Sequence, residues 1–235
     1  YKSMKKISLC LIIVLLFSIF VYWIGLTQRK IEPGTFGVLQ TKTNGLIEKP
    51  FLAGEKNWNW QFLLPTNSKL DIYKIEPYVE QVLIEGELPS GKLYGSLISD
   101  SYNFDYSFSY NIAVTISPEA VIELIKLNQI TDNESLNKYL GCAAKTMAQL
   151  ATNYLLEKAK NNPGFTIESM RKDEVLRNVQ IYKEFPAVEV YSLSIEKSKI
   201  PDFALYNKLQ SGNLLSQSKI LNQQEENNDE KIDSN

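Results

Sequence analysis

The stretch Ile7–Leu26 reads ISLCLIIVLLFSIFVYWIGL, and it decides the class of the fold because it carries no charged residue. Twenty helical residues that rise about 1.5 Å each span roughly 30 Å, the hydrocarbon thickness of a bilayer. A single segment crosses that layer only as a helix, since lipid offers no partner to a free backbone group. The sequence therefore predicts a short tail over 1–6, a transmembrane anchor over 7–26, and a body held at a membrane.

The apolar stretch resembles a retained anchor more than a cleaved signal peptide. A signal peptide has a shorter apolar core and a small-x-small cleavage site. This core is long and ends in Val21–Leu26, where Tyr22 and Trp23 suit the membrane–water interface. Gly25-Leu26-Thr27 offers only a weak cleavage site, so we predict a single-pass protein of the cell membrane.

The charges beside the anchor barely discriminate its orientation. Lysines precede the apolar stretch, and Arg29-Lys30 follows it, so the positive-inside rule gives little contrast. A short N-terminal tail usually stays in the cytoplasm when a large domain follows. We therefore expect the C-terminal domain to lie outside the cytoplasm.

Composition excludes several classes of chemistry. The formal charge is −2 and no basic stripe with interleaved aromatic residues occurs, which argues against nucleic acid as a partner. Histidine is absent, which removes Ser-His-Asp and Cys-His catalysis and every metal site that needs histidine. Cys10 lies in the membrane stretch and Cys142 in a helical pattern, so no disulfide is expected. We expect Cys142 to be a small buried residue, and we predict no metal site and no cofactor.

The first part after the anchor has the pattern of β structure. Phe36–Gln40 predicts a short strand, and Thr43-Asn44-Gly45 carries a hairpin signal because Asn and Gly tolerate positive φ. A run of alternating apolar residues predicts a strand through Trp58, Trp60, Phe62 and Leu64, with Pro65 ending it. Further strands are expected around Leu70 and Ile72 and over Val79–Leu83. The glycines and the proline of this part, which we expect to shape turns, are Pro33, Gly34, Gly37, Gly45 and Gly54.

The middle of the chain combines a predicted loop with the most regular strand. Glu85–Ser101 contains Pro89 and several Gly and Ser residues and is predicted to be a loop. Alternating aromatic and apolar residues then place one face of a strand toward a core, or toward a ligand. We favour the core because such faces usually pack under helices. The members of this face are Tyr102, Phe104, Tyr106, Phe108, Tyr110, Ile112 and Val114.

Helical periodicity follows this strand. Ser117-Pro118 predicts a capped helix start. Thr131 and Glu134 form a capping-box pattern for a second, longer helix that ends at Asn161–Gly164. A third helix is expected over Ile167–Lys183, an alternating strand over Val188–Ile195, and a last short helix from Ile200-Pro201-Asp202 to about Leu209. The polar and acidic segment 210–235 is predicted to be disordered.

The order of these parts resembles that of a known family. Ile31–Leu39 reads IEPGTFGVL, Pro50–Gly54 reads PFLAG, and Trp58, Trp60 and Leu64-Pro65 follow. Later segments match in order as well, namely Phe108–Val114, Val188–Ile195 and Ile200–Lys208. Together these segments resemble the SPFH/band 7 family of stomatin, prohibitin, flotillin and HflK/HflC-like membrane proteins.

This resemblance implies an α+β fold, a transmembrane helix followed by a β-rich and then helical SPFH-like domain over 31–209. It also implies a non-enzymatic scaffold that self-associates, alone or with a related SPFH subunit, and that organises membrane proteins or modulates a membrane protease. Two departures accompany it. Glu85–Ser101 replaces a charged region of the family, and a short polar tail stands where relatives continue into a long coiled-coil helix. The resemblance therefore implies self-association and leaves open whether a cage or ring forms.

Two alternatives of other classes remain open. A membrane-tethered hydrolase could use serine with Lys145, which lies one turn from Gln149, or the loop carboxylates Glu85, Glu87 and Asp100. No Gly-x-Ser-x-Gly or Ser-x-x-Lys motif supports it, so we predict no catalytic residues. A tethered binding module could read a ligand on the Tyr102–Tyr110 face. One of Trp58 and Trp60 could anchor at the interface, with core packing the equal alternative.

Overall fold

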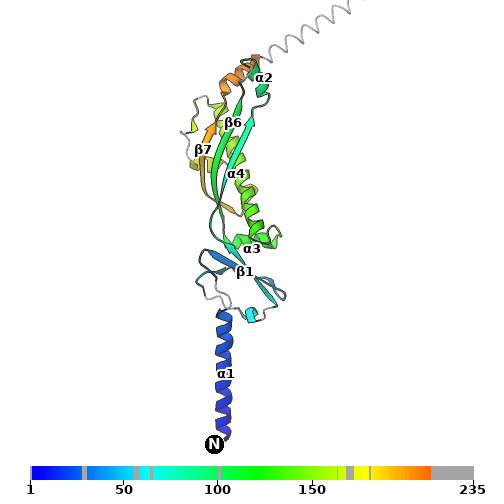
Figure 1. Cartoon of the computed structure of the whole chain (residues 1–235), viewed down its shortest axis with the longest axis vertical. Coiled ribbons are helices and arrows are strands. Elements are labelled where there is room, and N and C mark those ends of the chain that lie inside the picture. Colours follow the sequence, from blue (N-terminus) through cyan, green and yellow to red (C-terminus); the bar gives the residue numbers. More distant parts are fainter. Residues whose placement is uncertain are drawn as a thin grey trace, which may run out of the picture. The chain divides into compact units, whose positions relative to one another are not determined.

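The computed structural model describes residues 2–27, 31–55, 59–63, 66–99, 102–162, 164–167, 172–179 and 181–212. The fold is α+β, as predicted. The described elements, traced in chain order in Figure 1, are α1 (Lys2–Thr27), β1 (Thr35–Thr41), β2 (Gly45–Leu46), β3 (Phe51–Leu52), the 3₁₀ turn η1 (Trp60–Leu63), β4 (Ser68–Lys74), β5 (Tyr78–Glu87), α2 (Gly91–Ser96), β6 (Asp105–Ile116), α3 (Pro118–Lys126), α4 (Asn133–Asn161), α5 (Lys172–Asn178), the 3₁₀ turn η3 (Ile181–Lys183), β7 (Val188–Lys199) and a last helix over 203–212.

The chain divides into two compact units, and several elements pass from one to the other. The first unit contains Tyr1–Val79, Ala113–Ala143 and Phe185–Tyr191. The second contains Glu80–Ile112, Ala144–Glu184 and Ser192–Asn235.

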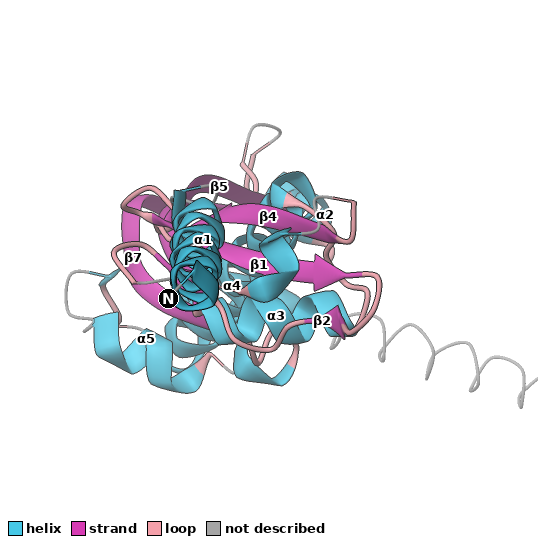
Figure 2. Ribbon diagram, turned by 90° about the horizontal axis from the view of Figure 1, so that it is seen from below, coloured by secondary structure: helices cyan, strands magenta, loops and turns pink. Residues whose placement is uncertain are grey.

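An antiparallel sheet around β1 organises the first unit. β4 pairs with β1 along its whole length, from Thr35 opposite Lys74 to Thr41 opposite Ser68, and β2 and β3 pair with the other side of β1. Figure 2 shows β1 between β4 and β2. The Asn-Gly turn is confirmed, because Gly45 has a φ of 69° and opposes Thr41.

The second unit contains most of a sheet in the order β5-β6-β7. Ser109 of β6 meets Glu196 of β7, and Ser194 of β7 meets Asn111 of β6, so the residue numbers run in opposite directions and the strands are antiparallel. The face formed by Phe108 and its neighbours is buried, and Tyr110 bonds to α4. The core interpretation of this face is therefore confirmed.

The predicted strand around Trp58–Leu64 is wrong within the described residues. Trp60–Leu63 forms a 3₁₀ turn, because the side chain of Asn59 accepts a bond from the Gln61 amide at 3.0 Å and starts a turn. Gln61 and Phe62 are both buried, which a strand with alternating faces does not allow. Trp58, Leu64 and Pro65 lie outside the described residues.

The predicted loop over Glu85–Ser101 is also wrong. β5 continues to Glu87, and α2 follows over Gly91–Ser96. Gly95 lies so close to the backbone carbonyl of Tyr102 that a Cβ atom would collide with it. The glycine that suggested a loop instead allows close packing of backbone on backbone.

Three further expectations need correction. The third helix over Ile167–Lys183 is replaced, where described, by the shorter α5 and the turn η3. Cys142 is exposed, because its position on α4 faces outward. Gly37 lies inside β1 and not at a turn; a Cβ there would come within 2.8 Å of Leu70, so its role is close packing.

Candidate functional site

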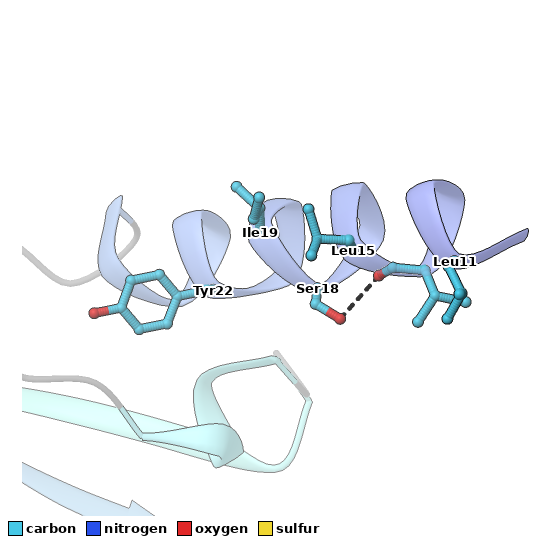
Figure 3. Close-up of a pocket in the computed structure, with 6 residues that line it drawn as sticks. Leu11, Leu15, Ser18, Ile19 and Tyr22 are labelled. Carbon is cyan, nitrogen blue, oxygen red and sulfur yellow. Dashed lines mark hydrogen bonds between the residues drawn. The ribbon is translucent and has the colours of Figure 1, made fainter. Parts of the chain in front are cut away.

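Helix α1 is the first candidate for function, because its apolar side chains are exposed in the described fold. Leu11 is 66% exposed and Tyr22 is 51% exposed. Figure 3 shows both on α1 together with Leu15, Ser18 and Ile19. The hydroxyl of Ser18 donates to the Val14 carbonyl at 2.9 Å, so this polar group has a partner within the helix, as an apolar environment requires.

The length and composition of α1 fit a membrane span over Lys6–Trp23. An anchor and a signal sequence both satisfy this criterion. Helix α1 is therefore long and apolar enough to cross a bilayer. Its length and composition do not decide whether the mature protein retains it.

The residues considered for a serine–lysine hydrolase take ordinary surface roles. Lys145 on α4 forms an ion pair with Glu80 of β5 at 3.4 Å, and its side chain is 62% exposed. Gln149, one turn further along α4, is exposed as well. The structure brings Lys145 to a carboxylate that the sequence analysis did not single out.

The loop carboxylates are used separately. The hydroxyl of Ser107 donates to Glu85 at 3.4 Å, and Lys92 lies 3.8 Å from Glu87. Asp100 lies outside the described residues. Among the described parts of the chain, no three Asp, Glu, Cys or His side chains lie close enough together to hold a metal ion.

The aromatic face of β6 is an interior and not a platform. Phe108 and Tyr110 are stacked with their ring centroids 6.1 Å apart, and both are buried. The hydroxyls of Tyr110 and Thr152 lie 2.8 Å apart. Burial raises the pKa of Tyr110 to about 12, and the hydrogen bond with Thr152 lowers this pKa by a smaller amount. Phe104, Phe108 and Tyr110 are fully buried, whereas Tyr106 is half-buried and Tyr102 is exposed just before the strand.

A polar network that no sequence pattern predicted joins α4 to α5. Tyr154 and Lys158 both donate to the same oxygen of Glu174, at 3.0 and 2.9 Å. Asn178 donates to the Tyr154 hydroxyl at 3.2 Å. Hydrogen bonds from Lys158 and then Tyr154 hold the pKa of Glu174 below its usual value. The i, i+4 spacing within each helix was visible in the sequence, but the pairing of the two helices was not.

Trp60 is the described candidate for an interfacial tryptophan. It begins η1 and is 51% exposed, whereas Phe62 of the same turn is buried against Phe51. Exposure separates Trp60 from the core, so core packing does not account for its side chain. Trp58, the other candidate, lies outside the described residues.

The sheet of the second unit presents an outer strand with an exposed apolar residue. β5 stands at one end of the order β5-β6-β7, and Leu83 in its middle is 60% exposed. Outer strands carry backbone groups that can pair with another chain. Among the described hollows of the first unit, one of about 500 Å³ lies along α1 and is lined mostly by apolar side chains, and two of about 230 and 180 Å³ lie beside Thr41 and Tyr78. The exposed edge of β5 in the second unit is a candidate interaction surface.

Comparison with known proteins adds a distant relative. No family model matches the chain. An uncharacterized protein of Treponema pallidum (strain Nichols) is 23% identical over 195 residues, which cover 81% of this chain and 65% of that protein. The chain thus matches just under two thirds of that relative's length.

Proposed function

We propose that this protein is a single-pass, membrane-anchored scaffold of the SPFH/band 7 kind, which self-associates and organises membrane proteins. The observation that carries the proposal is α1, in which the uncharged stretch Ile7–Trp23 exposes its large apolar side chains ahead of a folded α+β body. Exposed apolar surface of this extent is stable only when lipid or protein covers it. In this proposal α1 lies permanently in the bilayer.

The sequence of parts supports the family resemblance. The segment that resembles the family's opening forms an antiparallel sheet, in which Gly34, Gly45 and Gly54 all have positive φ. The long strand β6 leads to the helices α3 and α4, and β7 returns afterwards. Each motif glycine with positive φ occupies a position that other residues adopt only with strain.

The proposed partners are the lipid bilayer and a second copy of the chain or a related SPFH subunit. A membrane protease is a further proposed partner, whose activity the scaffold would modulate. In this proposal the C-terminal domain lies outside the cytoplasm, an orientation that chemical labelling of the exposed Cys142 tests. No nucleic acid and no catalytic residue enter this proposal.

Mass measurement in mild detergent tests self-association. Light scattering of the purified full chain over a hundredfold concentration range should give a mass of at least two copies after subtraction of the detergent. Membrane fractionation tests the anchor separately. Leu15→Arg places a charge at the centre of the proposed span, which disfavours insertion, so this variant should be lost from the membrane fraction. The matched control Leu15→Ile should remain in the membrane fraction. A wild-type protein that is monomeric at every concentration would contradict the scaffold.

A further inference from the structure

Strand β5 of the second unit has the features of a pairing edge. It is an end strand of its sheet, and its residues Glu80–Gly86 alternate between the two faces. Val82 is buried on the inner face, where Glu80 pairs with Lys145 of α4. Leu83 is exposed between Gln81 and Glu85 on the opposite face. An exposed Leu on an end strand is a combination that soluble sheets usually avoid.

The backbone of Leu83 points away from β6. Just beyond the two strands, the Leu88 amide donates to the Phe104 carbonyl at 3.1 Å, and Ser107 of β6 meets Glu85 of β5. The residue numbers run in opposite directions, so β5 and β6 are antiparallel. Backbone groups alternate along an antiparallel pair, so the even-numbered residues of β5 bond to β6. The amide and carbonyl of odd-numbered Leu83 are therefore directed to the open edge.

An antiparallel pair of two β5 strands centred on Leu83 is self-complementary. Leu83 then faces its own copy, Val82 faces Ile84, Gln81 faces Glu85, and Glu80 faces Gly86. The apolar side chains of the two strands then face one another. Gln81 of each copy can donate its side-chain amide to the Glu85 carboxylate of the other copy, so the pair contains two such bonds. No carboxylate faces another carboxylate. A pair centred on Glu85 would instead bring two like charges together. This register is also the one that uses the outward backbone groups of Leu83.

We propose that two copies of this chain associate through β5, antiparallel and centred on Leu83, to join their sheets across a two-fold axis. The inference rests on the proposed scaffold function and names the surface by which the scaffold self-associates. The partner is a second copy because the strand matches its own sequence in charge and in apolar pattern. A two-fold contact of this kind uses the same patch on both subunits.

The membrane is part of this proposal. Pairing of seven residues on each strand buries less surface than a standard stable interface of about 1,600 Å². Two chains held by α1 in one bilayer meet at a high effective concentration, so a small interface suffices there. The tests therefore use the full chain in lipid vesicles.

Cross-linking at Leu83 tests the position of the axis. In a background with Cys10→Ser and Cys142→Ser, Leu83→Cys is compared with Leu97→Cys, an equally exposed leucine just after α2. Paired residues in an antiparallel ladder lie about 5.5 Å apart, so a short bis-maleimide should join Leu83→Cys into a dimer at least fivefold more than Leu97→Cys. Equal cross-linking in a protein that still associates would overturn the β5 interface and leave the scaffold standing. A monomer by mass would overturn both.

Two matched variants at Gln81 test the register. Gln81→Lys places a cation opposite Glu85 and should strengthen association, whereas Gln81→Glu opposes two carboxylates at two places and should weaken it several-fold. Leu83→Pro removes the outward amide without removing a bond to β6, and should give monomers that unfold at a similar denaturant concentration. The proposal fails if Gln81→Glu and Gln81→Lys associate alike, or if Leu83→Pro still associates as the wild type does.

Discussion

Tyr110 shows how one residue ties strand β6 to helix α4. Thr152 donates its single hydroxyl proton to the Ala148 carbonyl at 2.8 Å. The proton between Tyr110 and Thr152 therefore comes from Tyr110, which donates to the Thr152 hydroxyl. This bond is buried in the second unit, where neither group can exchange it for water.

Replacing Tyr110 with Phe should lower the free energy of unfolding by about 0.5–1.5 kcal/mol near neutral pH, the value of one buried hydrogen bond. Burial raises the pKa of Tyr110 from 10 to about 12. The folded state thus holds this proton more tightly than the unfolded state, and the contribution is lost as pH rises from 10 towards 12. Urea unfolding of the wild type and Tyr110→Phe at neutral pH and above pH 10 measures it.

The difference in free energy of unfolding between the wild type and Tyr110→Phe should become smaller at high pH, because only the wild type has a hydroxyl proton to lose at this position. Thr152→Ser keeps the hydroxyl and is the control, with a smaller change than Tyr110→Phe at neutral pH. A gap that widens above pH 10 would show that Tyr110 is not held in its protonated form.

At the scale of elements, the start of α4 differs from its predicted cap by one position. The Asp132 carboxylate accepts a bond from the Ser135 amide at 2.8 Å, and the Ser135 hydroxyl accepts from the Asp132 amide at 3.0 Å. This reciprocal pair forms the capping box, in place of Thr131 and Glu134. The Ser135 hydroxyl also accepts a hydrogen bond from the Thr131 amide, so the backbone N–H groups of Thr131, Asp132 and Ser135 all have partners.

Asp132→Ala should destabilise the first unit more than Thr131→Ala, since only the former removes the cap. The hydrogen bond from the Ser135 amide is the largest of the effects that lower the pKa of Asp132 below its ordinary value of 3.8. The stabilisation is thus present above pH 3.8 and is lost as pH falls below it. Thermal unfolding of both variants and of Asp132→Asn, which keeps an acceptor, measures the effect. Equal losses in Asp132→Ala and Thr131→Ala would contradict this cap.

Elements whose apolar residues repeat with a strong period were predictable from the sequence. Elements that depend on close packing between distant parts of the chain were not. Alternation identified β6 and β7, and Ser117-Pro118 identified the start of α3, where Ser117 accepts from the Ala120 amide. α2 was missed because Gly91 and Gly95 signal a loop locally, while packing against Phe104 and Tyr102 makes them part of a helix. The turn η1 was missed because its aromatic residues imitate a strand.

At the scale of the whole molecule, the candidate site was the least predictable part. The apolar stretch of α1 is a property of composition, so the sequence alone revealed it. The interaction surface on β5 depends on which strand ends its sheet, and that order follows from tertiary pairing. Cys142 was predicted to be buried because a free cysteine usually packs as a small apolar residue, but its position on α4 is exposed.

The exposed Cys142 provides a native probe of topology. A membrane-impermeant maleimide should label it in intact cells, because the proposal places the C-terminal domain outside the cytoplasm. Cys142→Ser should abolish the labelling, which excludes Cys10 as its source. Labelling only after the membrane is opened would reverse the orientation of the chain.

Retention of α1 in the mature protein is the claim on which the account depends. The direct measurement is the intact mass of the protein in membranes washed at alkaline pH, which release proteins that are not embedded. The account predicts that the protein stays in the membrane pellet with residues 7–26 included in its mass. A mature chain that begins beyond Thr27 and is released by the wash would contradict it.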